Sequence, residues 1–107
     1  MITPKNYDDV QGLSHEETLE IVRSIMGDGR DYLNDLNNCW DVAGKFGIAL
    51  VPQSLDYGRY RWLACDLHSV TYAGDIRLRP KTCFGDENVA VAICKCAILT
   101  YFNIFED

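Results

Sequence analysis

Two stretches in the first half of the chain place apolar residues at helical spacing. The first predicts a helix over residues 15–26, where Ser14 and Glu17 have the spacing of a capping box and Gly27 follows the end. Its apolar positions recur at steps of three and four residues: Leu19, Val22, Ile25 and Met26. These steps keep them on one face of a helix, with charged residues facing away.

The second stretch predicts a helix over residues 35–46, with Asn34 as its N-cap and Gly47 just beyond its end. Its apolar stripe consists of Leu36, Trp40, Ala43 and Phe46. Residues 1–12 precede both helices and show no periodicity, so we expect them to form an extended N-terminal arm.

Beyond Gly47 the pattern favours strands at residues 48–51, 60–67 and 75–80, with turn-forming residues between them. Residues 68–72 either form a fourth strand or extend the second one. Connections this short cannot cross over a sheet, so the strands are predicted to be antiparallel.

One long apolar segment follows and predicts a helix over residues 87–105, capped near Asp86. A helix without a polar face is normally buried on most sides. We expect it to pack across the sheet at the centre of the core, and any part left uncovered to form a homodimer interface. The predicted fold is α+β: two N-terminal helices, a three- or four-stranded antiparallel sheet, and a long buried C-terminal helix packed on the sheet.

Composition indicates a single domain over residues 1–107, because 48% hydrophobic and 24% charged residues are a globular balance. The five cysteines are an odd number with irregular spacing, and the N-terminus lacks a basic stretch followed by an apolar run. These features argue against a secreted, disulfide-bonded protein. We expect a cytoplasmic protein without a membrane span, whose free thiols pack as small hydrophobic side chains.

The net charge of −6 originates in the first half of the chain. Residues 1–56 carry ten acidic and four basic side chains, whereas residues 57–107 carry six of each. A negative surface disfavours direct nucleic-acid binding and attracts basic patches on other proteins. The same charge also keeps a protein soluble, so it does not establish a partner by itself.

No residue pattern predicts catalysis, a metal or a cofactor. Cys94 and Cys96 are two residues apart, which on a helix directs them to nearly opposite sides, whereas structural zinc needs four convergent ligands. No local signature joins a cysteine or serine to a base, and His68 has no evident nucleophile beside it. We therefore expect a non-enzymatic protein without catalytic residues, metal or cofactor.

A basic and aromatic sheet face is the first candidate binding surface. Its members are Arg59, Arg61, Trp62, Arg77, Arg79 and Lys81. Apolar and basic residues alternate over residues 76–81, which in a strand places the three positive charges on one face. If this strand pairs with the preceding one, a compact site for phosphate, RNA or an acidic partner results. The alternative is a solvated face, or arginines paired with the chain's own acids.

An acidic face is the second candidate, and its members are Asp28, Asp31, Asp35 and Asp41. A calcium loop that began at Asp31 would require glycine at its sixth position and glutamate at its twelfth, where the chain has Leu36 and Val42. The face is therefore either an acidic helix start, favourable to the helix dipole, or a protein-docking surface.

Short runs of residues carry a likeness over most of residues 14–99. They are Asp31-Tyr32-Leu33-Asn34-Asp35, Cys39-Trp40, Phe46-Gly47-Ile48-Ala49-Leu50, Trp62-Leu63-Ala64, Asp86-Glu87-Asn88 and Ala92-Ile93. In these runs the chain resembles the NinX family of small tailed-phage proteins. The resemblance implies a phage or prophage origin and no catalytic residues.

The leading hypothesis is a phage accessory protein that binds a host protein or nucleoprotein complex and modulates or inhibits it, for instance as an anti-CRISPR-type inhibitor of host defence. The alternative is a small-molecule or nucleotide binder that uses the basic and aromatic sheet face. We expect a monomer, or a homodimer formed through the C-terminal helix, with no membrane contact.

Overall fold

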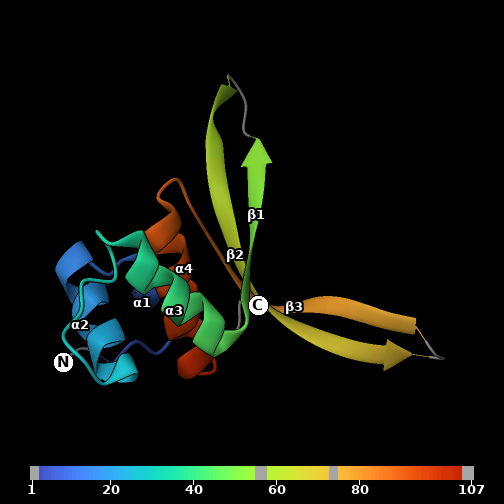
Figure 1. Cartoon of the computed structure of the whole chain (residues 1–107), viewed down its shortest axis with the longest axis horizontal. Helices are drawn as coiled ribbons and strands as arrows, with labels where there is room; N and C mark the ends of the chain where they lie inside the picture. The colour runs from blue at the N-terminus through green and yellow to red at the C-terminus, as the bar shows by residue number, and fades with distance from the viewer. Residues whose placement is uncertain (1–2, 55–57, 73–74, 105–107) are drawn as a thin grey trace.

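The computed structural model describes residues 3–54, 58–72 and 75–104, and the side chains of residues 67–81 lie outside the described part. Four helices gather on one side of the molecule: α1 (Tyr7–Gln11), α2 (His15–Met26), α3 (Leu36–Phe46) and α4 (Val89–Tyr101) (Figure 1). Three antiparallel strands form the sheet in the order β1-β2-β3: β1 (Ile48–Ser54), β2 (Tyr60–Tyr72) and β3 (Asp75–Asp86). The predicted α+β architecture is confirmed, with the C-terminal helix packed on the sheet.

The ends of α2 follow the sequence closely. Ser14 Oγ accepts from the Glu17 amide at 3.1 Å, and Glu17 Oε1 accepts from the Ser14 amide at 2.9 Å, which completes the predicted capping box. Gly27 ends the helix with a φ of 77°, a left-handed conformation that costs glycine little. For α3 the predicted cap was wrong by one residue. The side chain of Asp35, not Asn34, accepts from the Asn37 amide at 3.0 Å.

The expectation of an extended arm over residues 1–12 was wrong. The chain forms α1 there, capped by the Asn6 side chain, which accepts from the Asp9 amide at 2.8 Å. Val10 is fully buried and Tyr7 packs on the ring of Phe84, with 5.7 Å between ring centroids. A helix of five residues is too short to show a 3.6-residue period, so tertiary contacts and not periodicity define it.

Helix α4 is shorter at both ends than predicted. Its N-cap is Asn88, whose side chain accepts from the Ala90 and Val91 amides. Asp86, the predicted cap, instead accepts from the amide of Asn88. Its C-terminus is a Schellman motif, because the Ile104 amide donates to the Leu99 carbonyl at 2.9 Å. The predicted end at residue 105 lies outside the described residues.

The core is centred on α4, as its composition predicted. This helix contacts every other helix and strand, with α1, α2 and α3 on one side and the sheet on the other (Figure 1). Each side chain from residue 92 to residue 99 is buried, including that of Lys95. Because the chain's own elements cover α4, a homodimer interface is not needed to explain its apolar composition.

The strands are longer than predicted, and residues 68–72 are the continuation of β2. The β2–β3 ladder pairs Asp66 with Thr82 and Leu67 with Pro80, so Lys81 is the extra residue of a β-bulge. A bulge bends a sheet. The β1–β2 hairpin and the far half of the β2–β3 hairpin accordingly leave the helical layer in different directions (Figure 1).

Candidate functional site

The basic residues of the sheet do not form the compact face that the sequence suggested. Strands β2 and β3 do pair, but Arg61 lies opposite Gln53 of β1, whereas Arg77 lies opposite Val70 near the far end of β2. Residues 61 and 70 are separated by roughly 30 Å of strand at about 3.3 Å per residue. One small ligand therefore does not contact both arginines.

Two of the predicted basic residues are engaged within the chain. The Arg59 guanidinium makes an exposed ion pair with Glu87 at 2.6 Å. Arg61 Nε donates to Gln53 Oε1 at 2.7 Å, and its guanidinium lies over Gly85, where an added Cβ would meet the Arg61 Cζ at 3.1 Å. Arg61 is thus held flat against the sheet. Pairing with the chain's own acids, the alternative interpretation of these arginines, is observed for Arg59, whereas Arg61 binds a glutamine.

The remaining members of the predicted basic face are distributed along β2 and β3. Trp62 is 36% exposed and lies opposite Asp86 on β3. Arg77 and Arg79 belong to the far half of β3, and Lys81 is at the bulge, which interrupts the alternation that was expected to align the three charges. The side chains of these three residues lie outside the described part of the chain.

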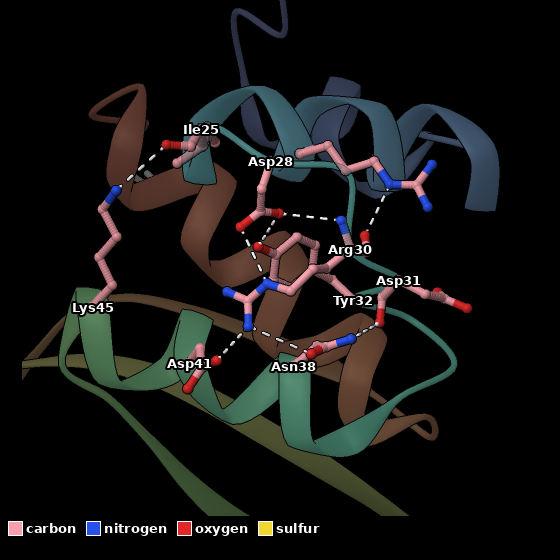
Figure 2. Close-up of polar contacts among 9 residues, drawn as sticks. Ile25, Asp28, Arg30, Asp31, Tyr32, Asn38, Asp41 and Lys45 are labelled. Carbon is pink, nitrogen blue, oxygen red and sulfur yellow. Dashed lines mark hydrogen bonds and ion pairs between the residues drawn. The ribbon is translucent and has the colours of Figure 1, made fainter.

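Two of the predicted acidic residues, Asp28 and Asp41, by contrast come together where the chain passes from α2 to α3 (Figure 2). Arg30 is the centre of this cluster, which we call the Arg30 cluster. Its guanidinium binds Asp28 at 3.1 Å and Asp41 at 2.7 Å, and it contacts the Tyr32 ring from 5.2 Å. The hydrogen bond with Asp41 is the main reason that the pKa of Arg30 is raised. Arg30 therefore ties the end of α2 to the outer side of α3.

Tyr32 anchors the same cluster in the core. Its side chain is fully buried, and its hydroxyl donates to Asp28 Oδ1 at 2.5 Å. This hydrogen bond is the largest cause of the lowered pKa of Asp28, and burial is the largest cause of the raised pKa of Tyr32. Sequence reasoning missed Tyr32 and Arg30, because their roles depend on contacts between segments and leave no local motif.

The other two acids of the predicted face stabilise turns. Asp31 accepts from the Leu33 and Asn34 amides, and the Asn34 backbone hydrogen bond is the main cause of its lowered pKa. Asp35 caps α3. Of the four predicted acids, only Asp35 lies at the start of α3, as its N-cap. Every member of the predicted acidic face contacts a group of its own chain.

An apolar surface on α3 was not anticipated. The buried positions of this helix are Cys39, Val42 and Ala43. Of the stripe inferred from the sequence, Ala43 and Phe46 face the core, whereas Leu36 and Trp40 do not. Leu36 and Trp40 are 47% and 50% exposed, although they are among the largest apolar side chains of the helix. They are four residues apart and therefore adjacent on the surface. We call these two residues the α3 flank.

The α3 flank and the Arg30 cluster occupy different sides of the helix. Asn38, which Arg30 Nη1 approaches at 3.5 Å, is two residues from both Leu36 and Trp40. Two residues correspond to about 200° around an α-helix, so Asn38 points away from the flank. Among residues 3–54, 58–66 and 82–104, the other large exposed apolar side chains are Val51, Tyr60, Trp62 and Tyr101.

Within the described residues, no group of three or more His, Cys, Asp or Glu side chains is arranged to hold a metal ion. No helix in this part of the chain is long and apolar enough to cross a membrane. Comparisons with protein-family models, curated proteins and solved structures found no match to the chain.

Proposed function

We propose that the protein is a non-enzymatic accessory protein of phage or prophage origin that binds a host protein in the host cytoplasm and modulates or inhibits it. The α3 flank is the proposed docking surface. One observation carries the proposal: Leu36 and Trp40 are half exposed on successive turns of a helix whose Cys39, Val42 and Ala43 are packed in the core. A few residues supply most of the binding energy at protein interfaces, and tryptophan is one of the residue types enriched among them.

The charge of the helical layer indicates the chemistry of the partner. Residues 3–54 carry nine acidic and four basic side chains, which gives this part of the molecule a negative field. Such a field accelerates association with a basic surface and disfavours an acidic one. We infer a partner with an apolar pocket surrounded by lysine and arginine. Nucleases and nucleoprotein complexes of host defence carry basic surfaces for nucleic acid, so inhibition of such a system fits the proposal.

The nucleotide-binding alternative has less support. It needs several arginines and an aromatic ring around one ligand, whereas Arg61 lies near the start of β2 and Arg77, on β3, pairs with Val70 near the end of β2. Arg59 and Arg61 already bind Glu87 and Gln53. No observation on the described residues favours this alternative over protein docking.

The proposal is tested by capture from host lysate followed by titration with the purified partner. The tested variant carries Leu36→Ser and Trp40→Ser. The matched control carries Tyr60→Ser, because Tyr60 is a 66% exposed aromatic side chain in a different part of the molecule. We expect wild type and control to retain the same partner in stoichiometric amount, and the double variant to lose it. Added salt should weaken the complex because the surfaces carry opposite charge.

Two results would overturn the proposal. One is equal capture by the Leu36 and Trp40 double variant, which would move the interface elsewhere on the molecule. The other is the absence of any stoichiometric partner with folded wild-type protein. Circular dichroism of all three proteins establishes that the comparison is made between folded chains.

A further inference from the structure

Two cysteines form a contacting pair on the face of the sheet that is turned away from the helices. Cys65 of β2 and Cys83 of β3 are direct partners in the antiparallel ladder, and their sulfurs are 2.8 Å apart. Their neighbours Ala64 and Phe84 belong to the core cluster. Side chains alternate between the two faces along a strand, so both thiols lie on the opposite face.

We propose that Cys65 and Cys83 are a thiol–disulfide exchange site that takes a small-molecule disulfide such as oxidised glutathione. Paired residues of an antiparallel ladder have Cα atoms about 4.5–5.5 Å apart, within the range of about 4.4–6.8 Å that disulfides span. A sulfur–sulfur bond of about 2.05 Å requires the two sulfurs to approach by less than about 1 Å. The backbone therefore needs no rearrangement.

Exposure assigns different roles to the two thiols. Cys83 is half-buried on the edge strand, whereas Cys65 is 5% exposed on the central strand. Burial, and then the contact with Cys83, raises the pKa of Cys65 to about 12, so Cys65 holds its proton near neutral pH. Cys83 is accordingly the thiol that meets the reagent, and Cys65 is the thiol that resolves the intermediate.

The exchange proceeds in two steps. The Cys83 thiolate attacks one sulfur of oxidised glutathione, the electron pair of that disulfide leaves with one glutathione thiolate, and a mixed disulfide forms at Cys83. Cys65 then gives up its proton to solvent and attacks Cys83 Sγ, and the second glutathione thiolate leaves. Two protein thiols are oxidised to one disulfide while one glutathione disulfide is reduced to two thiols.

The other cysteines provide an internal comparison. Cys39 and Cys94 also interact with each other, which lowers the pKa of Cys39 and raises that of Cys94. Both are fully buried between α3 and α4, and Cys96 is fully buried against Thr82. A dissolved disulfide does not reach these three thiols in the folded protein. Accessibility, and not proximity alone, distinguishes the pair on the sheet.

The experiment uses the full chain. Reduced wild-type protein is incubated with oxidised glutathione under native conditions, quenched with acid, alkylated in denaturant and mapped by peptide mass spectrometry. We expect a linked pair of peptides containing Cys65 and Cys83, with Cys39, Cys94 and Cys96 alkylated. Wild-type protein alone decides the main point, because failure to form this link in the folded chain overturns the proposal.

Variants then test the assigned roles. Cys65→Ser should retain a glutathione adduct at Cys83, Cys83→Ser should lose both the link and the adduct, and the control Cys96→Ser should still form the link. A link between other cysteines, or an adduct at Cys65 in Cys83→Ser, would contradict the assignment. Failure of host-protein capture has no bearing on these results, so this inference and the proposed function fail separately.

Discussion

The two sides of α3 use their side chains in opposite ways. On the side of the Arg30 cluster, the charged residues bind one another: Arg30 forms ion pairs with Asp28 and Asp41. The sequence had suggested a binding surface there. On the other side, Leu36 and Trp40 remain half exposed, although the apolar pattern is typical of a helix face that packs on a core. Around α3, charged side chains join segments of the chain, whereas the two apolar side chains of the α3 flank are left exposed.

The largest expected loss of stability follows substitution of Tyr32, which anchors the Arg30 cluster in the core. Tyr32→Ala removes the largest fully buried side chain and should lower the free energy of unfolding by about 3–5 kcal/mol, as for other buried aromatic residues. Tyr32→Phe removes only the hydroxyl bond to Asp28 and should cost about 1 kcal/mol. Urea denaturation measures both. A similar cost for the two variants would mean that the hydroxyl, and not the packed ring, anchors the cluster.

The next largest loss of stability is expected at Lys95, a buried cation. Lys95 Nζ donates to the Gln11 carbonyl at 2.9 Å and the Leu13 carbonyl at 3.1 Å, and desolvation lowers its pKa. Lys95→Met keeps most of the stem but leaves these carbonyls unpaired, so we expect a loss of about 2 kcal/mol. Lys95→Arg is the control for charge. A stability of Lys95→Met equal to wild type would show that the cation is not needed to hold α1.

Lowering the pH should weaken the contacts made by carboxylates, whereas Leu36 and Trp40 of the α3 flank carry no acidic group. Hydrogen bonds lower the folded-state pKa values of Asp28 and Asp31 below 3.8 and that of Glu17 below 4.5. The stabilisation that these groups provide is complete above the unfolded values and is lost as pH falls through the lower folded values. Urea denaturation across this range should show falling stability. A variant with Glu17→Gln, Asp28→Asn and Asp31→Asn should show a weaker dependence, and an unchanged slope would refute this assignment.

The smallest effect on stability is expected at the α3 flank. Leu36→Ala and Trp40→Ala should each change the free energy of unfolding by about 0.5 kcal/mol or less, because neither side chain is buried. The free energy with which each variant binds the captured partner should fall by about 2 kcal/mol or more, as at a hot-spot position. Calorimetric titration and urea denaturation of the same samples compare the two effects. A large loss of stability without a loss of binding would reverse the roles assigned to the two sides.

Features encoded by local pattern were predictable from the sequence. The capping box at Ser14 and the glycine after each of α2 and α3 are set by neighbouring residues, and both were predicted. The composition of α4 likewise predicted its central position, because a helix without a polar face needs cover on all sides.

Features that depend on register or on distant contacts were not predictable. Alternation of charge in residues 75–81 gave no information about which residues of β2 they face, and the bulge at Lys81 is a property of the pair of strands. Arg30 and Tyr32 acquired their roles from the way α2 and α3 meet. The exposure of Trp40 similarly depends on the rotation of α3 against α4, which an apolar stripe specifies only loosely.

The central position of α4 has a consequence for synthesis on the ribosome. This helix follows in the chain every element that it contacts, and Lys95 is separated by more than eighty residues from the carbonyls that it binds. Helices α1 to α3 and the sheet therefore emerge before the surface on which they pack exists. Folding is expected to complete only after α4 has left the exit tunnel, and chains that stop before it should be substrates for chaperones and proteases.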